Sequence, residues 1–250
     1  MYPFIIKGYK FFGEDEIKLN TLFNLLEILT FRSKLINSRA NIQERLNYIL
    51  LNFKGDLIEL VSNIKVKLNE SWYWGDSNVN NYLNGVMYGN NVLNYLLWQY
   101  ENSIQNRGYS IKQFSIENEQ IEHISPQTPT NGDPISTGYQ VDENNEYSED
   151  FILKRLNSLG NLMLISGTHN QSIGNKAFKD KLNSYNRNPL LNQQAEIKEF
   201  AELENELFQW KENSIIRRHQ RIVDFSRKRW SFDNFDIKYL VPTIEEYLEL

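Results

Sequence analysis

One histidine in this sequence stands where it could do acid–base chemistry. His123 lies in the segment Glu122-His123-Ile124-Ser125-Pro126, at the end of a β-like stretch and directly before a loop. A neutral imidazole can take a proton from water near pH 7, a step that typically contributes about 10²–10⁴ in rate. The neighbouring carboxylate of Glu122 is the oxygen ligand that a hard divalent cation prefers. A lone histidine at a strand end can also be a hydrogen-bonded structural residue, so both interpretations stand at this point.

Further amide and amine side chains follow in the same half of the chain. Asn161 precedes a short apolar run at 162–165, and Asn170 and Lys176 come after that run. The amide oxygen of Asn170 is a second ligand suited to a hard cation, and Lys176 is able to contact a phosphate. The alternatives are a turn role for Asn161, a plain surface role for Lys176, and His169 in place of Asn170 as the ligand.

Apolar spacing and turn residues predict the elements that position these side chains. Residues 1–110 are expected to be a helical connector domain, because leucines recur at helical spacing over 22–29 and 57–64. Residues 111–250 follow as a second domain, with a strand over about 114–124 and a loop over 125–138. Ser148 then caps a helix, residues 161–165 form a buried strand, 166–170 a turn, and a helix passes through 177–185.

A long amphipathic helix is expected over roughly 193–230. Its apolar residues recur every seven positions at 208, 215 and 222, and basic residues are expected on the opposite side. Residues 176–230 carry 12 basic and 8 acidic residues, so the positive charge of the chain is concentrated late. A basic helix face can bind DNA phosphates or can simply be solvated. The residues expected to bind DNA are Lys176, Lys179, Arg217, Arg218, Arg221 and Lys228.

Composition excludes several classes of protein. The 250 residues include no cysteine, so disulfide scaffolds, thiol catalysis and a zinc–cysteine site are excluded. No run of about 20 apolar residues predicts a membrane span, and no signal peptide is seen, so the expected location is cytoplasmic. The net charge is −5, and residues 113–150 alone contribute nine acidic residues and no lysine or arginine.

Three sequence blocks together resemble a known family. They are Glu122-His123-Ile124-Ser125-Pro126-Gln127, then Leu159-Gly160-Asn161-Leu162-Met163-Leu164, then the segment 170–178, which reads NQSIGNKAF. Their order resembles the HNH (His-Me finger) nuclease domain and, more narrowly, the C-terminal nuclease domain of GmrSD-type restriction proteins. The segment 94–101 resembles the helix that precedes this domain in the family, and residues 1–45 resemble its helical connector.

The resemblance implies a fold and a reaction. The fold would be mainly α with a small α+β core, a helical body around a ββα-metal (His-Me finger) nuclease motif. His123 would be the general base, Glu122 and Asn170 would hold a divalent metal (Mg²⁺ or Mn²⁺), and no other cofactor is expected. In the resembling fold, Asn161 ties the two strands together by hydrogen bonds to the loop that carries the histidine.

The sequence therefore predicts a metal-dependent HNH endonuclease that hydrolyses DNA, in restriction–modification or antiviral (phage) defence, and it leaves open whether the substrate is modified DNA. The family's N-terminal nucleotide-binding domain has no counterpart motif here, so a separate nucleotide-binding subunit or domain is an expected partner, and no membrane partner is expected. Two alternatives remain, a catalytically inactive helical module that binds nucleic acid or protein, and a nuclease that cleaves RNA.

Overall fold

A computed structural model describes residues 1–37, 40–70, 74–105, 118–127, 134–187 and 189–235 of the chain. The chain divides into two compact units, one formed by residues 1–82 with 227–250 and the other by residues 83–226. The second unit holds every candidate catalytic and metal-binding residue, whereas Lys228, expected to bind DNA, belongs to the first unit. The predicted boundary at 110/111 falls inside this unit, which begins at Leu83 and so includes the helix that precedes the strand–loop region.

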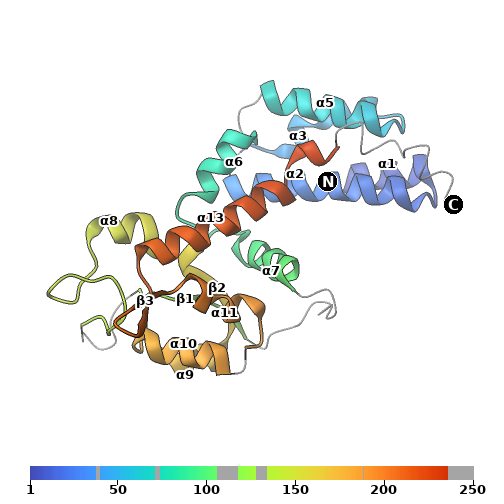
Figure 1. Ribbon diagram of the computed structural model, residues 1–250. Helices are drawn as coiled ribbons and strands as arrows, with labels where there is room; N and C mark the ends of the chain where they lie inside the picture. Colours follow the sequence, from blue (N-terminus) through green and yellow to red (C-terminus); the bar gives the residue numbers. More distant parts are fainter. Residues whose placement is uncertain (38–39, 71–73, 106–117, 128–133, 188, 236–250) are drawn as a thin grey trace. The chain divides into compact units, whose positions relative to one another are not determined.

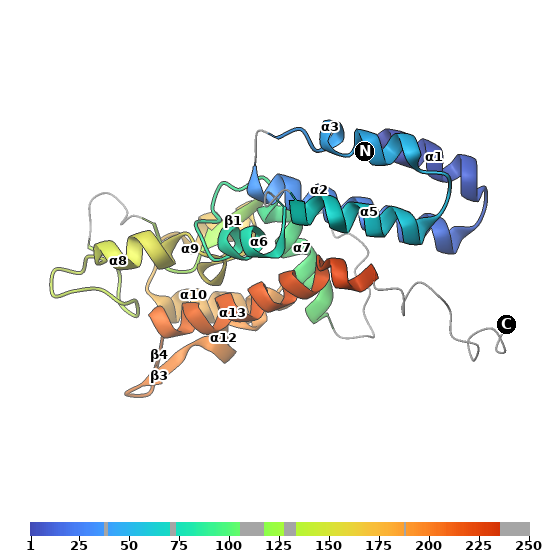
Figure 2. The same cartoon turned by 90° about the horizontal axis from the view of Figure 1, so that it is seen from above.

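The first unit is helical, as the leucine spacing predicts. In Figures 1 and 2, α1, α2 and α5 run alongside one another, and Leu22, Leu25 and Leu29 of α2 are completely buried. Asp56 caps α5 by accepting hydrogen bonds from two backbone N–H groups of its first turn. The elements are α1 (Tyr2–Phe12), α2 (Glu16–Ile36), α3 (Ile42–Arg45), α4 (Asn47–Asn52), α5 (Leu57–Glu70), α6 (Asp76–Leu83) and η4 (Phe232–Phe235).

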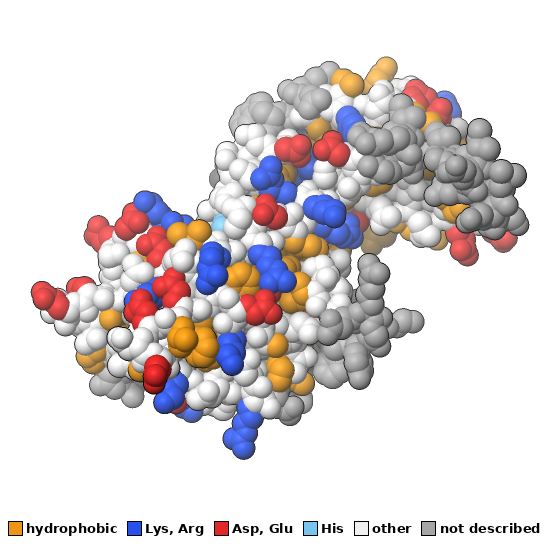
Figure 3. All heavy atoms as spheres, in the orientation of Figure 1, with side chains coloured by type: hydrophobic (Ala, Val, Ile, Leu, Met, Phe, Trp, Pro, Cys, Tyr) orange, Lys and Arg blue, Asp and Glu red, His pale blue; other side chains and the backbone are white. Residues whose placement is uncertain are grey.

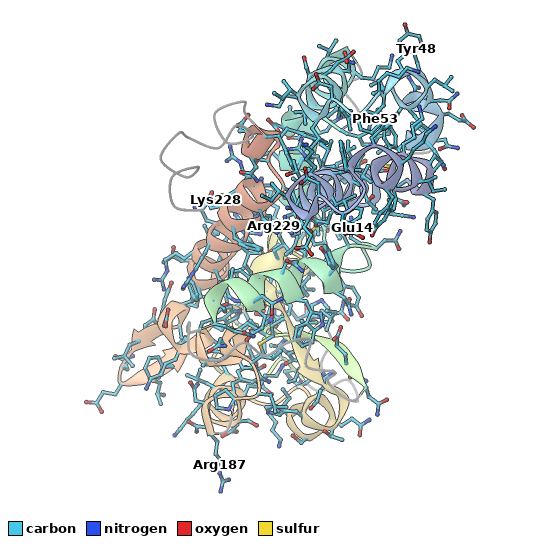
Figure 4. The ribbon with its side chains drawn as sticks, turned by 90° about the vertical axis from the view of Figure 1, so that its right-hand side faces the viewer. Glu14, Tyr48, Phe53, Arg187, Lys228 and Arg229 are labelled. Atoms are coloured by element: carbon cyan, nitrogen blue, oxygen red, sulfur yellow. The ribbon has the colours of Figure 1, made fainter. Side chains whose placement is uncertain are left out.

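Figure 4 shows how side chains of this unit are sorted between interior and solvent. Tyr48 on α4 points outward and is 78% exposed, whereas Phe53, directly after the same helix, is buried. Phe53 packs edge-on against Phe11 and Phe12 of α1. Aromatic packing therefore ties the end of α4 to the end of α1.

The second unit places helices around a two-stranded sheet (Figure 1). Its first half contains α7 (Leu93–Ile104), β1 (Glu119–His123), α8 (Glu149–Phe151), the π-helical turn η2 (Ile152–Leu156), the 3-10 turn η3 (Leu159–Asn161) and β2 (Leu162–Ser166). Its second half contains α9 (Gly167–Ile173), α10 (Phe178–Arg187), α11 (Asn192–Ala195), α12 (Ile197–Phe200), β3 (Glu202–Glu204), β4 (Leu207–Gln209) and α13 (Glu212–Arg229). The last three residues of α13 belong to the first unit.

The register of β1 against β2 decides which way each site residue points. The strands are antiparallel, with Glu122 opposite Met163 and His123 opposite Leu162. Side chains alternate along a strand and opposed residues share a face, so Glu122 and Met163 point to one side and His123 to the other. Regular pairing continues through His123, and no bend brings the two adjacent side chains together.

The core of the second unit lies on the Glu122 side of the sheet. Met163 and Ile165 of β2 pack there in one buried cluster with Phe178, Leu182 and Tyr185 of α10. All five residues of β2 are buried, so this strand is covered on both faces. The apolar run 162–165 is therefore a buried strand, as predicted.

Two predicted elements differ from the structure. The segment 166–170, expected to be a turn, begins the helix α9, because the Ser166 hydroxyl accepts a hydrogen bond from the His169 N–H and caps it. The prediction of one long helix over 193–230 is also wrong. Only α13 is a long helix there, and the β3–β4 hairpin precedes it.

The hairpin explains why apolar spacing misled the prediction. Asn205 and Glu206 both have positive φ, which is the backbone of a tight two-residue hairpin turn. Phe208, counted as the first member of the seven-residue apolar repeat, lies in β4. Figure 2 shows the hairpin projecting beside α12 and α13. The seven-residue spacing between Phe208 and the apolar residues of α13 therefore matches a helical repeat by coincidence.

The expectation of a mainly helical fold with a small β component is confirmed. The two sheets have two strands each, and the remaining elements of the described residues are helices or helical turns. Within the same residues, no helix has both the length and the apolar character that a membrane span needs.

Candidate active site

The imidazole of His123 is held in one orientation and one tautomer at the end of β1. Its side chain is 7% exposed, and its Nε2 lies 3.0 Å from Oδ1 of Asn157. The same Oδ1 accepts a hydrogen bond from the Gln127 amide at 3.3 Å, which supports this orientation of the Asn157 amide. A carbonyl oxygen only accepts, so Nε2 carries a proton, and in the neutral ring Nδ1 therefore keeps its lone pair.

The surroundings of His123 keep the imidazole neutral. Burial lowers its pKa to about 4, against a smaller opposing effect of the Asn157 hydrogen bond. The ring of Tyr88 packs edge-on against the imidazole at 4.5 Å between centroids. Within the described residues, Nδ1 makes no hydrogen bond. At neutral pH, His123 is therefore an uncharged imidazole with an uncommitted basic nitrogen, the form that a general base requires.

Asn157 is itself fixed by backbone contacts from a distant segment. The N–H groups of Met87 and Tyr88 both donate to the Asn157 carbonyl oxygen, at 2.8 and 3.3 Å. The segment that carries Tyr88 over the imidazole is thus the one that anchors Asn157. Neither residue stood out in the sequence, because their contacts with His123 span 34 or more positions and follow no motif.

Asn161 ties the loop that carries His123 to the start of β2. Its Oδ1 accepts from the Ser125 N–H at 2.8 Å, and its Nδ2 donates to the Ser125 carbonyl at 3.1 Å. The same side chain donates to the Leu156 carbonyl and accepts from the Trp210 indole. Asn161 is completely buried, so it does not touch a substrate and acts by positioning.

Gly160 is required by the close approach of α13. A Cβ atom at this position would lie 2.1 Å from the backbone oxygen of Ile215, a contact that no side chain tolerates. The block Leu159-Gly160-Asn161 therefore combines a contact point for α13 with the amide that holds the His123 loop.

Glu122 does not share a pocket with His123. It points into the core, is 5% exposed, and its Oε1 accepts from Lys181 Nζ at 2.6 Å and from the Tyr185 hydroxyl at 2.8 Å. Burial raises the pKa of Glu122, and the Lys181 ammonium opposes that rise. The expected convergence of Glu122 and His123 on one cation is not found, because adjacent residues of a regular strand face opposite ways.

Asn170 and His169 lie on α9, away from the imidazole of His123. Asn170 Nδ2 donates to the Gln120 side chain at 2.8 Å, on the same strand face as Glu122. His169 uses both ring nitrogens, Nε2 with the Ser184 hydroxyl at 2.9 Å and Nδ1 with the Gln194 amide at 3.3 Å. The alternative ligand His169 therefore has no nitrogen left for a metal ion in this arrangement.

The expected metal donors do not fit a divalent cation as they are placed. The inward carboxylate oxygen of Glu122 already binds an ammonium ion, and a second cation next to it would be repelled by the first. No group of three or more histidine, aspartate or glutamate side chains in the described parts of the chain could hold a metal ion. The metal assignment to Glu122 is thus not supported by the donor set.

Lys176 and Lys179 flank the start of α10 and are exposed. Lys176 Nζ donates to the Ser172 carbonyl at 2.7 Å, a contact between neighbouring residues at the helix surface. The Lys176 backbone carbonyl accepts from the Tyr139 hydroxyl at 2.8 Å. Both side chains face solvent, where a polyanion can reach them, and among the described residues no contact joins them to His123.

Arg218 does not lie on the exposed basic face of α13 on which it was expected. It is completely buried, pairs with Glu196 at 2.9 Å and donates to three backbone carbonyls around the Leu159–Asn161 turn. The reason is helical geometry, since position 218 lies between Ile215 and Ile222 on the inward face at i+3 and i−4. Arg218 therefore does not bind DNA.

The other basic residues of α13 are exposed but partly paired. Arg221 lies 3.3 Å from a Glu199 carboxylate oxygen, and Arg217 donates to the Phe200 carbonyl. Lys228 is exposed, whereas Arg229 turns inward to pair with Glu27 at 3.0 Å. In the view of Figure 3, basic side chains are interspersed with apolar, acidic and other side chains, so no continuous cationic surface is seen on this face.

A neutral histidine at the end of a two-stranded sheet, with an asparagine securing its loop and helices following the second strand, defines a histidine-centred strand–strand–helix domain. Residues 76–225 match the family described as GmrSD restriction endonucleases, C-terminal domain. This match covers more than half of the chain, and the chain belongs to this family. The resemblance inferred from the three sequence blocks is thereby confirmed.

The matched segment nearly coincides with the second unit, residues 83–226. Membership of this family indicates a restriction-type nuclease, and a nuclease of this type implies DNA as its substrate. No curated protein and no solved structure matches the chain.

Proposed function

We propose that this chain is an endonuclease that hydrolyses phosphodiester bonds in DNA, with His123 as the general base. One observation carries the proposal. Nε2 donates to Asn157 Oδ1 at 3.0 Å, so Nδ1 is left with its lone pair on a neutral ring. Hydrolysis needs a group that takes the proton of the attacking water, and His123 has the protonation state for that step.

The remaining residues support this role by holding the imidazole in place. Asn161 fixes the loop after His123, and Asn157 fixes the ring itself. A base displaced by about 1 Å can cost as much as 10²-fold in rate, so these contacts matter for catalysis. The exposed Lys176, Lys179, Arg217, Arg221 and Lys228 are proposed to attract the DNA backbone, and Arg218 is excluded from this set.

Cleavage of supercoiled plasmid by the purified chain tests the proposal. Wild type is compared with His123→Ala and with His169→Gln, a control at a histidine whose two nitrogens are already bonded to protein groups. We expect His123→Ala to lose about 10²–10⁴ in nicking rate and His169→Gln to stay near wild type. Equal rates for wild type and His123→Ala would contradict the proposal.

The same assay separates the competing functions. Parallel reactions contain Mg²⁺, Mn²⁺ or EDTA, which measures the metal requirement without assuming which residues hold an ion. Labelled RNA in place of plasmid tests the RNA-cleaving alternative. Absence of cleavage in every reaction, with DNA binding retained, would favour a catalytically inactive nucleic-acid-binding module.

The proposed role in the cell is restriction of phage DNA, including DNA with modified bases. Plating phage on cells that express wild type or His123→Ala tests this role, and protection by wild type alone is expected. Addition of nucleoside triphosphates to the cleavage assay tests dependence on a nucleotide-binding partner.

A further inference from the structure

Lys181 places a buried ammonium group directly behind the strand end that carries His123. Its Nζ lies 2.6 Å from Glu122 Oε1, 3.0 Å from the His123 carbonyl oxygen and 3.3 Å from the Ile124 carbonyl oxygen. The Lys181 side chain is 1% exposed. Three oxygen acceptors match the three N–H donors of an ammonium group, and a neutral amine has only two.

The carboxylate of Glu122 is oriented to accept a hydrogen bond from this ammonium. Besides Lys181, the Tyr185 hydroxyl donates to the same Oε1 at 2.8 Å. Burial lowers the pKa of Lys181, and the carboxylate of Glu122 opposes that effect. A buried charge is tolerated only when it is paired and hydrogen-bonded, and here both charges meet these conditions.

The ammonium group and Asn161 together fix three consecutive residues. Lys181 binds the carbonyl groups of His123 and Ile124, and the Asn161 amide binds both backbone groups of Ser125. The backbone of the imidazole-bearing residue and of the two residues after it is therefore fixed by side chains from η3, directly before β2, and from α10. Helix α10, which carries Lys181, follows β2 and lies far from His123 in sequence.

We infer that Lys181 is a positioning residue for His123, and that Glu122 binds this lysine instead of a metal ion. The ammonium occupies the place at the carboxylate that a metal ion would need, and it holds the strand end as a bound cation would. The inference rests on the proposed function, since it assigns how that function's general base is kept in place.

Steady-state cleavage kinetics test the positioning role in the full chain. The variants are Lys181→Met and the double variant Glu122→Gln with Lys181→Met. The control is Lys154→Met, whose exposed ammonium pairs with Asp150 on the same helical segment and, within the described residues, with no other carboxylate. We expect kcat to fall at least tenfold in the first two variants, KM to change less than twofold, and the control to match wild type. Wild-type kcat in a folded double variant would overturn the inference.

The double variant guards against a simple folding failure. Lys181→Met alone leaves a buried carboxylate without its partner and is expected to be unstable, whereas the double variant removes both charges and keeps the side-chain volumes. Circular dichroism and urea unfolding establish that each protein is folded before its kinetics are measured.

A spectroscopic measurement separates failure of this inference from failure of the proposed function. In ¹⁵N-histidine-labelled protein, the ring nitrogens of His123 report their protonation and surroundings without any substrate, and His123→Ala identifies its signals. We expect these signals to shift in the double variant and to coincide with wild type in Lys154→Met. Unchanged His123 signals would overturn the inference even if cleavage is never observed.

Titration with Mn²⁺, followed by electron paramagnetic resonance, tests the statement about Glu122. The variant is Glu122→Gln, which keeps an oxygen acceptor for Lys181 and Tyr185. We expect Glu122→Gln to bind Mn²⁺ with the same affinity as wild type, or, if wild type does not bind Mn²⁺, not to bind it either. A tenfold or greater loss of Mn²⁺ affinity in Glu122→Gln would make Glu122 a metal ligand and overturn this half of the inference.

Discussion

Replacing Asn161 with alanine removes the side chain that joins the His123 loop to β2. Four hydrogen bonds are lost, two with the backbone of Ser125, one with the Leu156 carbonyl and one with the Trp210 indole. Asn161 is completely buried, so water does not take its place without rearrangement. The substitution therefore leaves two N–H donors and two carbonyl acceptors inside the protein with fewer partners.

The expected cost follows from these groups. A buried polar group left without its partner costs about 1–3 kcal/mol, and buried carbonyl oxygens are left under-satisfied more often than N–H groups. With the two N–H groups dominating, we expect Asn161→Ala to lower the free energy of unfolding by roughly 3–5 kcal/mol. The midpoint of thermal unfolding then falls by roughly 2–4 °C for each kcal/mol, or about 6–20 °C in total.

Urea unfolding followed by circular dichroism measures this loss. The matched control is Asn183→Ala, an exposed asparagine on α10, for which we expect a change within about 0.5 kcal/mol. If Asn161→Ala and Asn183→Ala unfold at the same urea concentration, the four hydrogen bonds do not hold the loop, and the assigned role of Asn161 is refuted.

Two further predictions concern the imidazole and the arginines. Asn157→Asp places a carboxylate next to Nε2 of His123, which raises the pKa of the imidazole from about 4 by roughly 1–2 units. The general base is then protonated at higher pH, so the acid limb of the pH–rate profile should move upward, and an unmoved limb would contradict the role of His123. Arg218→Met removes the buried partner of Glu196 and leaves it only the Arg221 guanidinium, 3.8 Å away, and the Tyr100 hydroxyl. We expect this substitution to lower the free energy of unfolding in urea by about 3–5 kcal/mol, through lost packing and pairing and not through lost DNA contacts. Arg221→Ala should change stability by less than about 1 kcal/mol and reduce the salt dependence of DNA binding, measured by fluorescence anisotropy, by about one phosphate contact. If Arg221→Ala caused the large loss of stability and Arg218→Met reduced the salt dependence of DNA binding, the inward and outward faces of α13 would be wrongly assigned.

Local patterns were sufficient to predict much of the fold around the site. Apolar spacing identified α2 and α5 of the first unit, and the apolar run after Asn161 identified β2. Ser148 was recognised as a helix cap, and its hydroxyl accepts from the Phe151 N–H. These features depend on residues within one or two turns of each other, so neighbouring sequence contains the information.

The same reasoning failed where a local pattern had two physical solutions. The seven-residue spacing that begins at Phe208 fits a continuous helix, yet Asn205 and Glu206 turn the chain into a hairpin. Asn205 is tolerant of positive φ, but Glu206 is not typical of it, so no strong turn signal was available. Segment 114–117 of the expected strand lies outside the described residues.

The chemistry of the site illustrates what the sequence alone determined. It identified His123 as the candidate base, Asn161 as the residue that secures its loop, and the family to which the chain belongs. Each of these rests on residue type and order along the chain, which a motif preserves.

Only the tertiary structure decided which partner each polar group has. Lys181 meets Glu122 from 59 positions away, and Asn157 meets His123 from 34. Strand register sends Glu122 and His123 to opposite faces, and the packing of α13 buries Arg218. The physical reason is that a charge or imidazole takes its properties from burial and from the atoms around it, and folding brings those atoms from distant segments.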